Sequence, residues 1–112
     1  MLQRPVDPKT VVREAALQLS VVIPTKNEVG NVEPLLERLG VSLAGIEWEA
    51  IFVDDNSTDG TPEILTGIAQ TDRRVRLIRR LGRRGLSSAV VEGALASTTP
   101  IVAVIDADLQ HD

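Results

Sequence analysis

The apolar residues of this chain are concentrated in four short runs that are rich in valine and isoleucine. The runs cover residues 19–24, 49–55, 75–80 and 100–108. Branched side chains at this density predict β-strands. The first, second and fourth runs are almost continuously apolar, as expected when helices cover both faces of a parallel sheet.

The segments between these runs have the periodicity of helices. Val32, Leu35 and Leu39 fall on one helical face, and Thr61 is expected to cap the next helix. The third segment, residues 85–97, is rich in small residues. Three strand–helix units followed by a fourth strand predict an α/β fold, Rossmann-like, with a mostly parallel sheet and flanking helices.

Composition narrows the classes of function. A length of 112 residues fits one domain, and the absence of cysteine excludes disulfides, thiolate metal sites and thiol nucleophiles. Trp48 and Phe52 are the only aromatic residues and the net charge is −4, so we expect no nucleic-acid partner. No apolar stretch reaches the roughly 18 residues of a membrane span, which indicates a soluble or peripheral chain.

Polar residues follow all four predicted strands, where ligands bind in open α/β sheets. The fourth end, "DADLQHD", carries Asp106 and Asp108. In an extended segment these two carboxylates point the same way, and with the carbonyl of Gln110 they suit Mg²⁺ or Mn²⁺. Two carboxylates leave coordination positions open for substrate phosphates. The alternative is an acidic strand end that is merely solvated.

The second end carries adjacent carboxylates, Asp54 and Asp55. Only one of the two can point at a ligand, so we expect the other to anchor the loop. Asp59 is interpreted as part of a turn. The third end has a basic cluster that we interpret as a solvated face, with phosphate or an anionic membrane as the alternative ligand. The cluster comprises Arg79, Arg80, Arg83 and Arg84.

The first end reads "PTKNE". Lys26 can neutralise phosphate, and Asn27 and Glu28 can form hydrogen bonds to a nucleoside. An ordinary polar loop before a helix explains the same residues.

Four motifs occur in the order "VVIPTKNE", "FVDDNSTDGT", "GLSSAVVEG" and "VIDADLQHD". Together they resemble the nucleotide-binding half of the inverting glycosyltransferases of family two, and within it the dolichol- or polyprenol-phosphate mannose synthases. The resemblance implies that residues 19–112 are the nucleotide-sugar-binding part of a GT-A glycosyltransferase domain. We expect a loosely ordered leader at residues 1–18 and a sheet that is truncated after its fourth strand.

The resemblance also implies roles for individual residues. Four positions would contact the nucleoside: Pro24, Glu28, Val53 and Asp55. Lys26 stands where the family usually has tyrosine. Three residues would lie along the diphosphate of the donor: Asp106, Ala107 and Asp108. The metal ligands would be Asp106, Asp108 and Gln110, and the two aspartates would be the catalytic residues.

The implied reaction transfers a sugar, mannose from GDP-mannose, to a polyprenyl or dolichyl phosphate with inversion; related enzymes use UDP-glucose or other donors. The acceptor phosphate is largely dianionic near neutral pH and attacks unaided, because its second pKa is about 6. The metal then stabilises the leaving diphosphate. A lipid acceptor implies a cytoplasmic protein, peripheral at the cytoplasmic face of the membrane.

Two other interpretations share parts of this pattern. A receiver-type signalling domain has a similar length and an acidic Mg²⁺ site, but its paired acids follow the first strand. An inert, truncated transferase that at most binds nucleotide shares every motif. Because the family's catalytic domain extends beyond the second aspartate of the D-x-D motif, we expect the 112-residue chain alone to be inactive and weakly folded.

Overall fold

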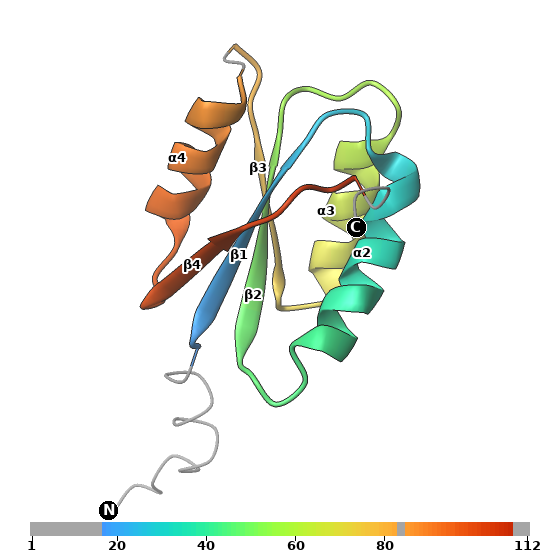
Figure 1. The fold of residues 1–112 in the computed structure, drawn as a ribbon. Coiled ribbons are helices and arrows are strands. Elements are labelled where there is room, and N and C mark those ends of the chain that lie inside the picture. The colour runs from blue at the N-terminus through green and yellow to red at the C-terminus, as the bar shows by residue number, and fades with distance from the viewer. Residues whose placement is uncertain (1–16, 83–84, 109–112) are drawn as a thin grey trace, which may run out of the picture.

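The computed structural model describes residues 17–82 and 85–108, in which strands and helices alternate (Figure 1). The predicted leader lies almost entirely outside the described residues. In chain order the elements are β1 (Leu19–Thr25), α2 (Val29–Ser42), β2 (Trp48–Asp54), α3 (Thr61–Thr71), β3 (Val75–Arg79), α4 (Leu86–Ala96) and β4 (Ile101–Val104). The predicted strands and helices are confirmed, with shorter bounds for β4.

The four strands of the described residues form one sheet in the order β3-β2-β1-β4, and every neighbouring pair is parallel. Parallel neighbours require a connection across a face of the sheet, which each helix provides. In Figure 1, α4 lies on one face and α2 and α3 lie on the other. The predicted α/β architecture is therefore confirmed.

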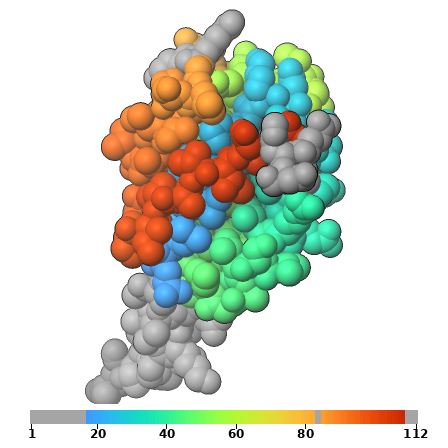
Figure 2. Space-filling model, in the orientation of Figure 1, coloured from blue at the N-terminus to red at the C-terminus, as the bar shows by residue number. Residues whose placement is uncertain are grey.

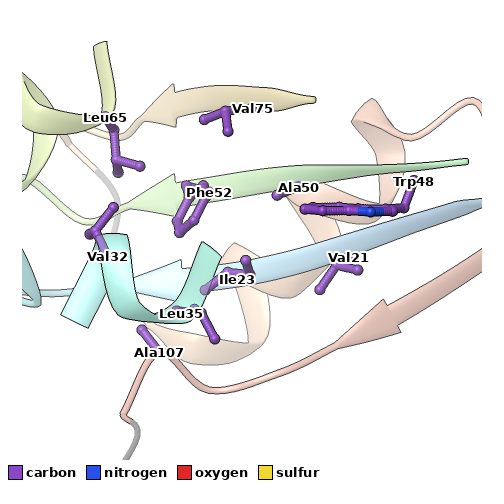
Figure 3. Packing of buried hydrophobic residues seen from close by; sticks show 10 residues of the cluster. All are labelled: Val21, Ile23, Val32, Leu35, Trp48, Ala50, Phe52, Leu65, Val75 and Ala107. Carbon is purple, nitrogen blue, oxygen red and sulfur yellow. The ribbon is translucent and has the colours of Figure 1, made fainter. Parts of the chain in front are cut away.

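Successive residues of β1 and β2 point to opposite faces, which divides the core into two clusters. The larger cluster, between the sheet and helices α2 and α3, is shown in Figure 3. It contains Val21, Ile23, Val32, Leu35, Trp48, Ala50, Phe52, Leu65, Val75 and Ala107. The smaller cluster, under α4, contains Val22, Ile51, Val53 and Ala89. Full burial of a Val, Leu, Ile or Phe side chain contributes about 1.5–3 kcal/mol to the stability of the fold.

The packing of α4 on the sheet depends on a glycine. Gly93 is buried, and a Cβ atom at this position would lie only 2.4 Å from Cγ1 of Val22. The small side chains predicted for this helix therefore serve close contact with β1 and β2, and the backbone of α4 approaches the sheet where Gly93 lies.

The expectation that both faces of the fourth strand are covered is wrong. Ile101, Val102 and Val104 are 60%, 40% and 48% exposed, and the strand forms part of the molecular surface in Figure 2. The reason is position: β4 is an edge strand, whereas α4 packs on β1 and β2. Its unbroken apolar sequence therefore leaves an exposed sheet edge.

No helix within residues 17–82 and 85–108 is both long enough and apolar enough to cross a membrane.

Candidate functional site

Parallel pairing places the carboxyl ends of the strands at one edge of the sheet. Thr25 at the end of β1 is paired with Asp54, and Asp54 is paired with Arg79 at the end of β3. β4 ends earlier, where Val104 is paired with Val22. The segments that follow the strands therefore surround the edge where ligands bind in this class of fold.

Asp54 anchors the loop after β2. Its side chain is buried, and its Oδ1 accepts hydrogen bonds from the hydroxyls of Thr25 and Ser57, both at 2.7 Å. Its Oδ2 accepts the backbone N–H of Ser57 at 2.8 Å. These bonds occupy the carboxylate from inside the fold. Of the two adjacent aspartates, Asp54 is the structural one.

Asp59 joins the beginnings of two helices, as its interpretation as a turn residue suggested. Its Oδ2 accepts the backbone N–H of Val29 at the start of α2, and its Oδ1 accepts that of Thr61 at the start of α3. The hydrogen bond from the Thr61 hydroxyl, aided by these backbone bonds, lowers the pKa of Asp59. The predicted cap by Thr61 is wrong, because Thr61 is the first helical residue and Gly60 precedes it.

The first strand end is tied to the second by Lys26. The ammonium of this exposed residue donates to the backbone carbonyl oxygens of Asp55 at 2.9 Å and of Asn56 at 3.4 Å. Lys26 therefore holds the loop after β2 in this conformation. Its positive charge lies at the strand ends, where the prediction of phosphate neutralisation requires it.

The other predicted nucleoside contacts differ in exposure. Pro24 and Glu28 are half-buried at the end of β1 and at the start of α2. The carboxylate of Glu28 accepts a hydrogen bond from the Asn31 amide at 2.8 Å. Val53 is fully buried beneath α4, so a nucleoside would reach it only after a rearrangement.

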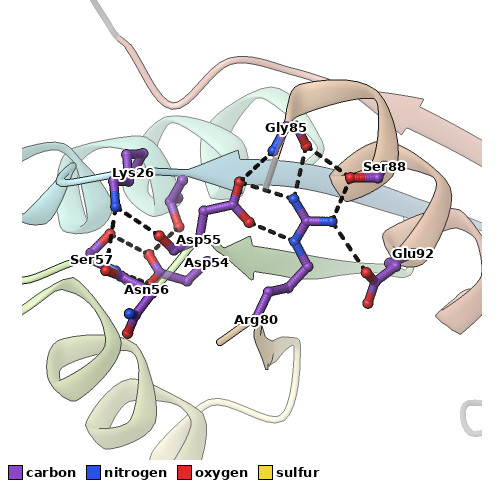
Figure 4. Close-up of polar contacts among 10 residues, drawn as sticks. Lys26, Asp54, Asp55, Asn56, Ser57, Arg80, Gly85, Ser88 and Glu92 are labelled. Carbon is purple, nitrogen blue, oxygen red and sulfur yellow. Dashed lines mark hydrogen bonds and ion pairs between the residues drawn. The ribbon is translucent and has the colours of Figure 1, made fainter. Parts of the chain in front are cut away.

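Asp55 forms an ion pair with Arg80, and both residues take part in a network of hydrogen bonds (Figure 4). Nε of Arg80 donates to Oδ1 of Asp55 at 2.5 Å, and Nη2 donates to Oδ2 at 2.9 Å. The backbone N–H of Gly85 also donates to Oδ2, at 3.3 Å. The hydrogen bonds from Arg80 are the main cause of the lowered pKa of Asp55. Asp55 is therefore held as an ionised carboxylate that only accepts hydrogen bonds.

The role of Arg80 was missed in the sequence, where it was grouped with three other arginines as a solvated face. Arg79 is exposed, whereas Arg80 is 1% exposed and lies inside the fold. Residues 83 and 84 of the cluster lie outside the described residues. Alternation along β3 gave no signal for Arg80, because it places Arg79, and not Arg80, on the same face as the buried Val75.

The segment after β4 carries the predicted metal ligands. The backbone N–H of Ile105 still donates to Val22 at 3.1 Å, but the strand has ended and the chain bends at Ala107. The expectation of an extended D-x-D segment is therefore wrong. Ala107 is buried in the core against α2, which draws the segment away from the sheet.

The two carboxylates of this segment flank the buried Ala107, with Asp106 exposed and Asp108 half-buried. Gln110, the predicted third ligand, lies outside the described residues. Within residues 17–82 and 85–108, no three His, Cys, Asp or Glu side chains are grouped so that they could hold a metal ion. Two hard oxygen donors fit a divalent cation whose remaining ligands come from substrate phosphates.

Comparison with known proteins identifies relatives. A dolichol-phosphate mannosyltransferase from Pyrococcus furiosus is 41% identical over 95 residues, which are 85% of this chain and 27% of that protein. The dolichol-phosphate mannosyltransferase of Saccharomyces cerevisiae is 39% identical over 99 residues, which are 86% of this chain and 37% of that protein. The chain thus spans about a third of the length of these relatives.

A solved structure shares the fold. Mannosyltransferase PcManGT from Pyrobaculum calidifontis, in complex with GDP-Man and Mn²⁺, has a TM-score of 0.69 at 30% identity, covering 81% of this chain and 27% of its own. The sequence model of the family described as "Glycosyl transferase family 2" matches residues 20–112. A receiver-type interpretation is thereby excluded. The chain belongs to glycosyl transferase family 2 and has the α/β architecture of its GT-A members.

Proposed function

We propose that this chain supplies the nucleotide-sugar-binding wall of a glycosyltransferase that transfers a sugar to a polyprenyl or dolichyl phosphate. The observation that supports the proposal is that Lys26 and the ionised Asp55 lie just after β1 and β2, and that Asp106 and Asp108 follow β4, in a chain of this family. The dolichol-phosphate mannosyltransferases among its relatives support mannose as the sugar and GDP-mannose as the donor.

Mg²⁺ or Mn²⁺ is the proposed cofactor, held by Asp106 and Asp108 with Gln110 as a further ligand. The Mn²⁺ in the complex of PcManGT supports a divalent cation at such a site. When bound, the cation acts as a Lewis acid on the diphosphate. The two aspartates would orient the diphosphate, with Ala107 between them, and balance the charge of the cation.

The remaining residues bind and orient the donor. The ionised carboxylate of Asp55 accepts N–H groups of a base, as uracil and guanine offer, and Glu28 and Pro24 border the same edge. The ammonium of Lys26 adds positive charge beside the loop after β2. Holding the donor in this way converts attack by the acceptor phosphate into a step within one complex, with inversion at the anomeric carbon.

The acceptor accounts for the proposed location. A polyprenyl phosphate keeps its tail in the bilayer, so its phosphate is reached from the membrane surface. We therefore place the enzyme at the cytoplasmic face as a peripheral protein. The lipid acceptor, rather than a described helix, provides the attachment in this proposal.

Radiolabelled transfer to polyprenyl phosphate by a full-length enzyme that contains this segment tests the function. We expect transfer from GDP-mannose to exceed transfer from UDP-glucose and to require Mg²⁺ or Mn²⁺. Asp108→Ala should reduce transfer by about 100-fold or more, because loss of a residue that only hydrogen-bonds to a metal ligand already reduces metal affinity or activity by about 10–100-fold. Asp72→Asn is the control, since Asp72 lies before β3, away from the carboxyl edge. Metal-dependent transfer retained by Asp108→Ala would contradict the role of that aspartate.

We propose a narrower function for the 112 residues alone. The exposed apolar surface of β4 and the chain's share of about a third of its relatives support a segment that is inactive and weakly folded by itself. Isothermal titration with GDP and Mn²⁺ should show weak or no binding. Tight binding together with cooperative thermal unfolding would contradict this expectation.

A further inference from the structure

Arg80 uses its entire hydrogen-bonding capacity inside the fold. Besides the two bonds to Asp55, Nη1 donates to the hydroxyl of Ser88 at 2.7 Å and to Oε2 of Glu92 at 3.2 Å. Nη2 also donates to the backbone carbonyl of Gly85 at 2.8 Å. A guanidinium has five N–H groups, so each has an acceptor.

The acceptors come from two separate parts of the chain. Asp55 follows β2, whereas Gly85, Ser88 and Glu92 lie at the start of α4 and on its first turns. Figure 4 shows the guanidinium between these two groups. Gly85 has a positive φ of 109°, a conformation that favours glycine, and it both donates to Asp55 and accepts from Arg80. Gly85, directly before α4, is therefore bound both to the carboxylate of Asp55 and to the guanidinium of Arg80.

Stability alone gives a poor account of this arrangement. The Arg80 side chain is 0% exposed, and burial of a guanidinium carries a desolvation penalty that can exceed the gain from its ion pairs. Replacing a whole buried group of ion pairs by apolar residues of similar volume is often neutral or even stabilising. The specific product of the arrangement is geometric: the forked guanidinium fixes both oxygens of Asp55 in one orientation.

We propose that Arg80 is a positioning residue for donor binding, which holds the carboxylate of Asp55 and the backbone of Gly85 in one preformed arrangement. The inference rests on the proposed function, because it takes Asp55 as the group that meets the nucleoside. Arg80 itself is buried behind Asp55 and does not touch the donor. Its contribution is to keep Asp55, which is 17% exposed, from rotating or shifting before the donor arrives.

The chain contains a matched control pair. Arg74 also donates from Nε and Nη2 to the two oxygens of Asp72, at 3.1 and 3.0 Å. This pair is partly exposed and lies before the first residue of β3, at the end of the sheet opposite the carboxyl ends of the strands. Arg74→Lys therefore removes the same forked contact without touching the site. Arg80→Lys keeps the charge at position 80, but its single ammonium has three donors and cannot form all five contacts.

The test is a double-mutant cycle on the KM for the nucleotide-sugar donor, measured in a full-length enzyme that contains this segment. We expect Arg80→Lys and Asp55→Asn each to raise KM by about tenfold, with a smaller change in kcat. If Arg80 acts through Asp55, the double variant should be no worse than Asp55→Asn alone. Arg74→Lys should leave KM and kcat unchanged.

A second readout does not depend on activity. Side-chain carboxyl NMR of the full-length enzyme should show the titration midpoint of Asp55 moving upward in Arg80→Lys, while Arg74→Lys leaves it unchanged. Additive effects on KM, or an unchanged Asp55 midpoint, would overturn the role of Arg80. If the unmodified full-length enzyme uses no nucleotide-sugar donor, the proposed function fails instead, and the NMR shift still decides whether Arg80 positions Asp55. If Arg80→Lys does not fold, Ser88→Ala is the second variant, because it removes one acceptor that holds the guanidinium and leaves Arg80 and Asp55 in place.

Discussion

Replacing Gly93 by alanine would place a methyl group against the sheet. An ideal Cβ at this position lies 2.4 Å from Cγ1 and 3.2 Å from Cγ2 of Val22, and 3.1 Å from Cγ2 of Val53. Carbon atoms in good contact are about 3.5–4.0 Å apart. Either α4 must move away from the sheet or two branched side chains must leave their preferred rotamers, which such residues resist.

The magnitude follows from two opposing effects. Alanine is favoured over glycine in a helix by about 1 kcal/mol, whereas overpacking of a core costs about 1–3 kcal/mol. Gly67 in α3 is the control, since a Cβ there has nothing within 4 Å. Gly67→Ala should therefore stabilise the protein by up to about 1 kcal/mol. Both variants share the propensity gain, so Gly93→Ala should be less stable than Gly67→Ala by about 1–3 kcal/mol.

Urea unfolding of a full-length enzyme that contains this segment, monitored by the fluorescence of Trp48, the single tryptophan of these 112 residues, measures this difference. Trp48 is buried and covered by Arg74, whose guanidinium carbon is 4.5 Å from the ring centroid. In a Val22→Ala background, where the clashing methyl groups are absent, Gly93→Ala should lose most of its cost. Equal stability of Gly93→Ala and Gly67→Ala would refute the argument, as would a cost that Val22→Ala does not relieve.

Three further changes test other parts of the structure. Asp54→Ala should lower the free energy of unfolding by about 3 kcal/mol in chemical denaturation, because it leaves the buried donors of Thr25 and Ser57 without their acceptor. A loss below about 1 kcal/mol would contradict the anchoring role of Asp54. Asp59→Ala should lower the stability of the protein at neutral pH. Because the pKa of Asp59 in the folded protein lies below the ordinary value of 3.8, the difference in stability between the variant and the unmodified protein should disappear as the pH falls below 3.8. A difference that does not change with pH in unfolding scans would contradict this role of the Asp59 carboxylate. We expect the exposed strand β4 to make the 112-residue chain self-associate, and Ile101→Lys should reduce the scattered light intensity, because a charge on an open edge strand opposes pairing with another chain. Unchanged scattering would show that β4 is not the contact.

The strands β1, β2 and β3 could be predicted from the sequence because runs of branched apolar residues are a local signal for a strand. Runs of branched residues mark β1, β2 and β3 within one residue of their observed bounds. The exposure of β4 was not predictable in the same way, since an apolar run reads the same whether a helix covers it or not. The bend at Ala107 likewise arises from burial against α2, a contact between residues far apart in sequence.

In the candidate site too, roles that depend on residue type could be predicted from the sequence, whereas roles that depend on distant contacts could not. That one of two adjacent aspartates anchors the loop was predicted, but the choice of Asp54 depends on which side chain faces Thr25 and Ser57. The turn role of Asp59 followed from residue type. Arg80 looked like one member of a basic cluster, because a buried arginine is recognised only by its distant acceptors.

The neighbouring positions of β1 and β4 constrain the order of folding. Leu19 at the start of β1 is paired with Ile101, although three helices and two strands separate them along the chain. During synthesis on the ribosome, the part from β1 to α4 can assemble before β4 has been made. Until then β1 has an open edge, and closing it requires a pairing between distant residues, which is slow. The nascent chain therefore passes through a stage in which its central strand is available to chaperones or to other nascent chains.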